Sequence, residues 1–146
     1  MKRYWYKFRV KYGKAPDTGK NKKVSEEYLV DAESFTETEK RATKAATELI
    51  GTRDFDITAI SREPITEILK EDENEGYHWY KTVVSLVTED EDTGVKKFSP
   101  QTIYVNAPST KEADHMLRQH MSSSVAEWEI KSIAKTKVLG VLGYKQ

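Results

Sequence analysis

The sequence predicts an α+β fold made of two tandem, duplicated ββαβ units with two helices, antiparallel or mixed sheets and pseudo-two-fold symmetry. Three observations lead to this prediction. Short motifs recur in the same order in the two halves, both halves contain segments with the two-residue period of a strand, and each half contains one helix-start signal. The recurring motifs lie 73 to 75 residues apart, so small gaps suffice to align the halves.

Five motif pairs carry the repeat. They are Trp5-Tyr6-Lys7 with Trp79-Tyr80-Lys81, Asp17-Thr18-Gly19 with Asp92-Thr93-Gly94, Lys22-Lys23-Val24-Ser25 with Lys96-Lys97-Phe98-Ser99, Val30-Asp31-Ala32 with Val105-Asn106-Ala107, and Phe55-Asp56-Ile57-Thr58-Ala59-Ile60 with Trp128-Glu129-Ile130-Lys131-Ser132-Ile133. Solenoid repeats are shorter, at roughly 20 to 50 residues, so one duplicated supersecondary unit is the better interpretation. Each half alone is close to the size at which a single core is only marginally stable, so we expect one shared compact domain.

The first half contains the signals of each element in turn. They predict a strand over 4–12, a turn-rich connection over 13–23, a strand over 24–32, a helix from Ser34 to about Ile50, a strand over 54–62 and a short closing element at 65–69. In the first strand, aromatic and β-branched residues alternate with Trp5 and basic residues, as is typical of a half-buried strand. Ser34 and Glu37 form a capping box, and Gly51 ends the helix.

The second half repeats this order. It predicts strands over 78–88, 98–107 and 128–135, an acidic turn between the first two, and a helix that begins at a second capping box, Ser109 with Glu112. Strand 78–88 is apolar on both faces, so we expect it to be more buried than its basic counterpart. The resulting boundaries are 1–70 for the first repeat, 71–76 for an acidic linker and 77–146 for the second repeat.

The helix of each unit lets the third strand return beside the first strand, parallel to the second strand. Two such units give six strands. They form either one continuous sheet or two sheets packed face to face, and the sequence does not distinguish these arrangements.

Composition narrows the class of protein. Charged residues make up 33% of the chain and hydrophobic residues 37%, and there is no cysteine, which excludes disulfides and thiol chemistry. No apolar run approaches the roughly 18 residues of a membrane span, and the first residues do not form a signal peptide. We therefore expect a cytoplasmic protein that does not bind a membrane.

The net charge of zero hides a strong asymmetry. Residues 1–23 hold nine Lys or Arg and one acid, a net charge of +8, whereas residues 63–92 hold ten acids and two lysines, a net charge of −8. This distribution predicts either an anionic partner for one surface or mutual neutralisation of the two segments.

The stretches 2–12, 30–37 and 58–62 (KRYWYKFRVKY, VDAESFTE and TAISR) resemble an uncharacterised family of small proteins of unknown function from Bacteroides-type gut bacteria and their phages. The resemblance covers nearly the whole chain. It implies cytoplasmic expression and a role in phage or mobile-element biology, but it transfers no activity and no functional residue.

The basic first hairpin is the strongest candidate binding site. Cations spaced along a strand can follow the phosphates of a nucleic acid, and an exposed indole can stack on a base. The alternative interpretation is a solvated face whose charges keep an edge strand from aggregating, or which pairs with the acidic segment. The candidate ligand-binding residues are Arg3, Trp5, Lys7, Arg9, Lys11, Lys22, Lys23, Trp79 and Lys81, and Lys14 and Lys20 add charge to the connecting loop.

Trp5 and Trp79 occupy equivalent positions in the two repeats. On a pseudo-two-fold axis, equivalent tryptophans and lysines could form a shared pocket for a planar anion such as a nucleotide. The alternative is that both indoles pack in a core. The second repeat lacks the full basic set, because Val83 and Ser85 stand where the first repeat has Arg9 and Lys11.

Other motifs do not indicate catalysis or metal binding. The two Asp-Thr-Gly triplets sit in polar turns, as turn chemistry favours, and do not resemble a protease pair. The acidic runs at 71–75 and 89–92 lack the ligand spacing of an EF-hand. His78, His115 and His120 lack the spacing of a zinc helix motif. We therefore expect a non-enzymatic protein without cofactors that binds nucleic acid or a nucleotide, or alternatively a protein-interaction module or homo-oligomer.

Overall fold

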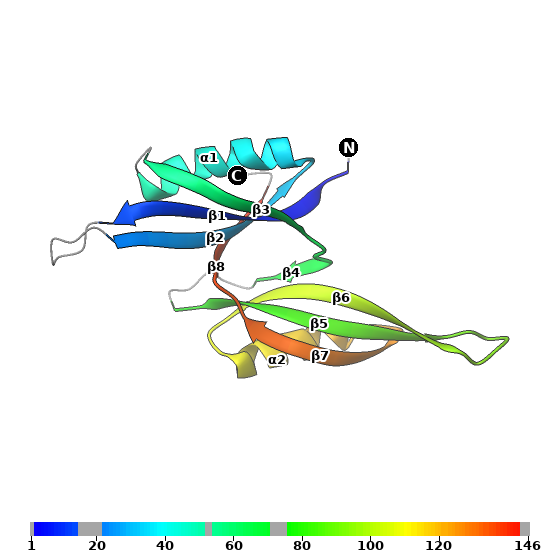
Figure 1. Cartoon of the computed structure of the whole chain (residues 1–146). Helices are drawn as coiled ribbons and strands as arrows, with labels where there is room; N and C mark the ends of the chain where they lie inside the picture. Colours follow the sequence, from blue (N-terminus) through cyan, green and yellow to red (C-terminus); the bar gives the residue numbers. More distant parts are fainter. Residues whose placement is uncertain (1, 15–21, 52–53, 71–75, 144–146) are drawn as a thin grey trace. The chain divides into compact units, whose positions relative to one another are not determined.

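The computed structural model contains two helices and two mixed sheets of four strands each, so the predicted α+β class is correct (Figure 1). The structure describes residues 2–14, 22–51, 54–70 and 76–143. The chain divides into two compact units, Met1–Pro64 with Lys137–Gln146 as unit 1 and Ile65–Thr136 as unit 2.

Unit 1 is a sheet with one covering helix. Its strands are β1 (Tyr4–Lys14), β2 (Lys22–Ala32), β3 (Phe55–Glu63) and β8 (Val138–Leu142), in the order β3-β1-β2-β8. β1 runs antiparallel to both β2 and β3, as predicted for a third strand that returns beside the first. β8 runs parallel to β2. Helix α1 (Phe35–Ile50) covers one face.

Unit 2 has the same construction. Its strands are β4 (Glu67–Leu69), β5 (His78–Glu89), β6 (Lys96–Ala107) and β7 (Glu127–Lys135), in the order β4-β6-β5-β7. β5 is antiparallel to β6 and β7, and β4 is parallel to β6. Helix α2 (Thr110–Met121) packs against β6 and β7.

The two sheets also match in register. In unit 1 the pairing of the first and third strands shifts between Arg9 and Val10, and in unit 2 it shifts between Val83 and Val84, which are the equivalent positions. A bulge at one equivalent place in both sheets is consistent with the tandem duplication predicted from the sequence.

The two repeats exchange their last strands. β4 follows β3 along the chain but pairs with β6 in unit 2, whereas β8 follows β7 but pairs with β2 in unit 1. The expectation of three strands per unit and six in all was therefore wrong. Each sheet has a fourth, parallel strand, and the chain forms two separate sheets. The short closing element predicted at 65–69 corresponds to β4, but its pairing with β6 was not predicted, and β8 was not predicted at all. Both strands are short and their partners lie far away in the sequence, so local periodicity does not show the pairing.

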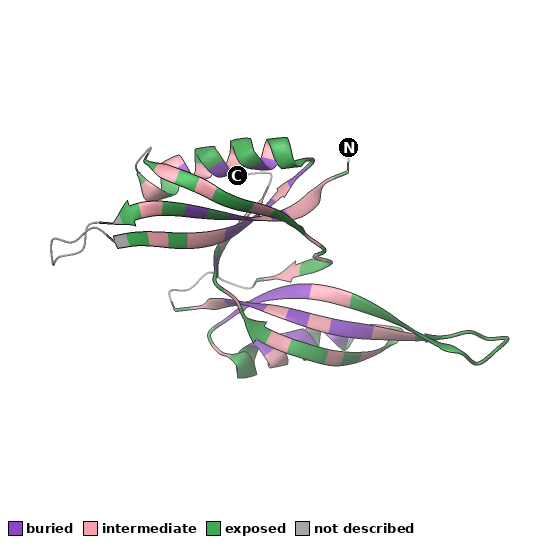
Figure 2. Ribbon diagram, in the orientation of Figure 1, coloured by how far each residue is buried: buried purple, intermediate pink, exposed green. Residues whose placement is uncertain are grey.

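Each unit has a core between its helix and its sheet (Figure 2). Unit 1 buries Tyr6, Phe8, Val10, Tyr28, Val30, Ala32, Ala42 and Ala46, and unit 2 buries Tyr80, Val84, Ile103, Val105, Ala107, Ala113, Leu117 and Met121. Strand β5 buries residues on both faces, including Trp79 and Ser85 on the face opposite Tyr80 and Val84. The prediction that this strand is more buried than β1 is confirmed.

Both helices begin at the predicted capping serines. The hydroxyl oxygen of Ser34 accepts a hydrogen bond from the backbone N–H of Glu37 at 3.1 Å, and that of Ser109 accepts one from Glu112 at 3.2 Å. Helix α1 ends at Gly51, whose φ of 73° lies in the left-handed region that glycine adopts without steric cost.

We predict that Ser34→Ala and Ser109→Ala each lower the free energy of unfolding by roughly 0.5–2 kcal/mol, because each leaves a helix N-terminal amide without its partner. Urea melts followed by circular dichroism would measure the change. The control is Ser132→Ala on the exposed side of β7, which should stay within about 0.5 kcal/mol of the parent protein. Unchanged melts for both cap variants would contradict the assigned helix starts.

The exchanged strand β8 gives a second prediction. Val138 is 4% exposed, whereas its neighbour Leu139 is 58% exposed. Val138→Ala should destabilise unit 1 by about 1–3 kcal/mol, and Leu139→Ala should have little effect. Hydrogen exchange would show where the protein is weakened: amides of β2 over 27–30, the segment paired with β8, should become less protected. Equal effects of both variants would contradict the pairing.

Candidate functional site

The open face of the first hairpin carries three exposed cations, Arg9, Lys11 and Lys23, and these three residues are called the basic face below. Tyr6, Phe8 and Val10 belong to the core under α1, so strand alternation directs Arg9 and Lys11 away from the helix. Lys23 lies on the neighbouring strand, opposite Gly13 in register. The alternation predicted from the sequence therefore places these cations correctly.

Lys7 lies on the same side of β1, but its charge is balanced. Its ammonium is 3.6 Å from a carboxylate oxygen of Glu27 on β2 and 3.5 Å from one of Glu63 on β3. Both acidic side chains are only 13% exposed. Lys7 thus connects β1 to both of its neighbours, β2 and β3, and its charge is directed toward these carboxylates.

Acidic residues also adjoin the basic face. Glu27 lies opposite Arg9 in register, and Asp56 lies opposite Lys11. Among the residues that the structure describes, no carboxylate forms an ion pair with Arg9, Lys11 or Lys23. A hollow of about 420 Å³ lies at this end of the sheet. Its lining is Lys11, Tyr12, Gly13, Lys23, Asp54, Phe55 and Asp56.

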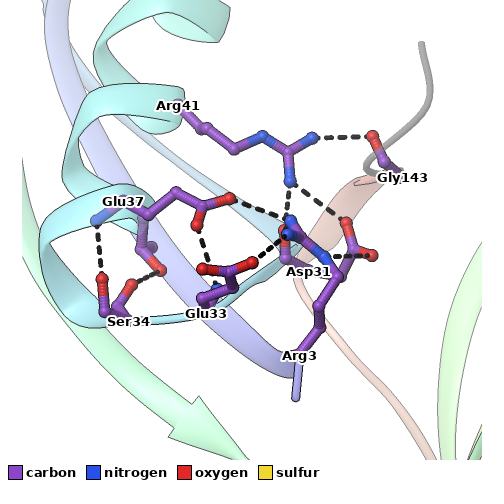
Figure 3. A network of polar contacts seen from close by, with 8 residues as sticks. Arg3, Asp31, Glu33, Ser34, Glu37, Arg41 and Gly143 are labelled. Carbon is purple, nitrogen blue, oxygen red and sulfur yellow. Dashed lines mark hydrogen bonds and ion pairs between the residues drawn. The ribbon is translucent and has the colours of Figure 1, made fainter. Parts of the chain in front are cut away.

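Arg3 belongs to a polar network at the start of α1 (Figure 3). Its guanidinium donates to the backbone carbonyl of Asp31 at 2.8 Å and to the Glu37 carboxylate at 2.9 Å, and it lies 3.6 Å from Glu33. From α1, Arg41 donates to Asp31. Arg41 also donates to the backbone carbonyl of Gly143, just beyond β8, at 2.7 Å, so the network ties α1 to β2 and to the end of the exchanged strand.

The network shifts two ionisation equilibria. Partial burial opposes the charge of Arg3, but the hydrogen bond to Glu37 and the charges of Asp31 and Glu37 outweigh it and raise the pKa of Arg3. The hydrogen bond from Arg3 is also the main cause that lowers the pKa of Glu37 below its ordinary value. Arg3 is therefore held in the fold by its own ion pairs.

The two tryptophans differ in environment. Trp79 is 3% exposed, and its carbonyl accepts two hydrogen bonds from Thr136, at 2.9 Å from the backbone N–H and 2.8 Å from the hydroxyl. Trp5 and Lys81 are half-buried. Trp5 belongs to unit 1 and Trp79 to unit 2, so the shared pocket predicted for a planar anion stays a prediction.

Several predicted features lie outside the described residues. They are loop 15–21 with Lys20 and the first Asp-Thr-Gly triplet, the linker residues 71–75, and the side chains of Lys14 and Lys22. The backbones of Lys14 and Lys22 are paired across the hairpin.

Glu27, Glu63 and Asp56 are the site residues that sequence reasoning missed. The signal for them was the predicted placement of the first strand between the other two, because cross-strand neighbours then have to include these acids.

No cluster of three or more potential metal ligands occurs in the part of the chain that the structure describes. None of the described helices has the length and apolarity needed to cross a membrane.

Residues 4–144 match the family described as a domain of unknown function, DUF4494. The chain therefore belongs to this family, which confirms that it is a member of an uncharacterised family. No curated protein matches the chain.

The lowered pKa of Glu37 predicts a pH-dependent stability. A carboxyl group whose pKa is lower in the folded state stabilises the fold above its unfolded pKa, near 4.3, and this contribution is lost as pH falls through the folded value. Glu37→Gln should therefore destabilise the protein at pH 7 and should approach the parent protein's stability as pH falls below about 4. Denaturant melts across this range measure the difference.

The control is the same comparison in an Arg3→Gln background. Without the guanidinium, the effect of Glu37→Gln should depend much less on pH, because the hydrogen bond from Arg3 is the main cause of the shift. An equally strong pH dependence in both backgrounds would contradict this assignment.

Proposed function

We propose that the protein is a non-enzymatic binding protein whose basic face binds nucleic acid or a nucleotide-like anion. One observation carries the proposal: Arg9, Lys11 and Lys23 are exposed on one face without an ion pair to any described residue. The neighbouring cations Arg3 and Lys7 are held in ion pairs. Among the described cations of the first hairpin, this difference leaves Arg9, Lys11 and Lys23 with charge available for a ligand.

The spacing of these cations suits an extended polyanion. Successive residues on one face of a strand are about 7 Å apart, so Arg9 and Lys11 can contact separate phosphates of one chain. Gly13 lies opposite Lys23 and has no side chain to cover it. Release of counterions from the phosphates would supply most of the affinity.

The acids beside the basic face favour a ligand that also carries hydrogen-bond donors. Asp54 and Asp56 line the same hollow as Lys11 and Lys23. A nucleotide has both kinds of group, since its phosphate accepts from lysine and its sugar hydroxyls and base N–H groups donate to carboxylates. The same acids limit affinity for phosphate alone, because they repel it.

The sequence resemblance supplies a biological setting for this proposal. In a cytoplasmic protein of Bacteroides-type bacteria or their phages, a nucleic-acid ligand would fit a role in phage or mobile-element replication. A small nucleotide ligand would fit interference with nucleotide-signalled defence.

A second candidate function is a protein-interaction module. The observation that favours it lies in unit 2, where Phe98 and Val95 are 60% and 57% exposed at the second hairpin. Exposed apolar residues that cluster on one element are typical of docking surfaces.

The test of the first proposal is the triple variant Arg9→Gln, Lys11→Gln, Lys23→Gln. Fluorescence anisotropy with labelled single- and double-stranded oligonucleotides at low salt should show weaker binding by the variant. The slope of log affinity against log salt should fall by about 0.7–0.9 for each phosphate that the variant no longer neutralises. Unlabelled mononucleotides and dinucleotides as competitors would distinguish a nucleotide site from a polymer site.

The matched control removes the same charge elsewhere. Lys40 and Lys44 are exposed on α1, which covers the other face of the unit 1 sheet, and Lys111 is exposed on α2 of unit 2. Their triple replacement by Gln should leave binding nearly unchanged. Equally weakened binding by the two triple variants would mean that only the net charge of the protein matters. Absence of oligonucleotide binding by the parent protein at micromolar concentration would refute the proposal.

A further inference from the structure

The second hairpin carries an apolar face opposite α2. Tyr80 and Val84 of β5 belong to the core, so alternation directs Val83 and Val87 to the other side of the sheet. Their cross-strand partners are Thr102 and Phe98. The residues Val83, Val87, Phe98 and Pro100, with Val95 beside them in the turn, are called the apolar arm below.

The apolar arm occupies the same place in unit 2 as the basic face in unit 1. Gly13 pairs with Lys23 in the first hairpin, and Val87 pairs with Phe98 in the second, at matching register. Val83 and Arg9 both immediately precede the shared bulge. By register, Lys23 and Phe98 therefore occupy equivalent backbone positions, one residue away from the sequence alignment, which pairs Phe98 with Val24. The two faces differ in chemistry at this position.

Acidic residues border the apolar arm. Glu89 is the last residue of β5, Asp90, Glu91 and Asp92 follow it directly, and all four are exposed. On the neighbouring strand β7, Glu127 pairs with Val87 and Glu129 pairs with Ser85. Lys96 and Lys97 balance part of this charge, and Lys131 forms an ion pair with Glu129 at 3.1 Å, so the remaining negative charge comes mainly from the residues at 89–92 and from Glu127. A partner that covers the apolar arm must therefore bring positive charge to its border.

The partner is expected to dock on the face and not along the strand edge. Within the described residues, β4 pairs with β6 only at Ile103–Val105, so the edge of β6 before residue 102 is open. Pro100 lies in this open stretch and has no N–H to donate. Proline at such a position prevents regular addition of another strand.

We propose that the apolar arm docks on the basic face of a second copy of this chain. Charge complementarity supports this occupant: an acidic border on one copy meets Arg9, Lys11 and Lys23 on the next. The Phe98 ring can lie against the aliphatic stems of lysine and arginine and interact with their charges. A chain of zero net charge has no overall repulsion to oppose such contact.

The association is head to tail, because the two contacting surfaces differ. The proposed association rests on the second candidate function, the protein-interaction module, and does not require nucleic acid. In such a dimer one copy keeps an unused basic face and the other keeps an unused arm, so the contacts can continue into longer assemblies unless they close into a ring. A polyanion on the basic face would compete with this association, since both need the same cations.

Sedimentation velocity of the full chain, without nucleic acid, tests the proposal over a range of protein concentrations at low salt. The parent protein should associate as concentration rises, and association should weaken with added salt. Phe98→Ser should abolish association by removing the arm. The triple variant Arg9→Gln, Lys11→Gln, Lys23→Gln should abolish it by removing the basic face.

A mixture of the two variants gives the decisive result. The Phe98→Ser protein keeps its basic face, and the cation variant keeps its arm, so the mixture should form one-to-one dimers and nothing larger. Val125→Ser removes a fully exposed apolar side chain of unit 2 that is not part of the arm, and this control should associate like the parent protein. Circular dichroism checks that each variant is folded.

Three results would overturn the proposal. They are a parent protein that stays monomeric at high concentration, continued association of either variant, and a mixture that stays monomeric. None of them bears on nucleic-acid binding, which the anisotropy assay measures separately with dilute protein.

Discussion

The parallel pairing of β8 with β2 and of β4 with β6 is the constraint on which the rest of the structure depends. Each sheet is completed by a strand from the other half of the sequence, so neither repeat closes its own sheet. The network of Arg3, Asp31, Glu37 and Arg41 reinforces this exchange in unit 1, because Arg41 connects α1 to the end of β8 through Gly143. The equivalent position in α2 is Met116, which packs against the unit 2 core instead.

Much of each unit could be predicted because its signals are local. Three strands and one helix can be identified in each half. The signals are the alternation in β1, the capping boxes at Ser34 and Ser109, and the repeat itself. The exchanged strands carry weaker signals: residues 65–69 predicted a short closing element but not its partner, and β8 had no predicted counterpart. β4 has three residues and β8 has five, and both pair only with distant partners.

The candidate site was predictable to the same extent. Alternation placed Arg9 and Lys11 on the open face of the sheet. It could not show that Lys7 lies between Glu27 and Glu63, because that depends on the register of β3 against β1. The burial of Trp79 likewise depends on tertiary structure. Cations that are neighbours in the sequence therefore differ in environment, and those without an ion pair to a described carboxylate remain for a ligand.

The exchange of strands also determines the order in which the protein can fold during synthesis. Unit 1 has its helix and three strands once Glu63 has been made, but its fourth strand follows only after the whole of unit 2. Until synthesis passes Leu142, the β2 edge at residues 27–30 lacks its parallel partner. An unpaired edge of Glu-Tyr-Leu-Val sequence is a hazard for pairing between nascent chains. The basic residues of the adjoining hairpin, which repel their counterparts on another chain, would reduce this hazard on the ribosome.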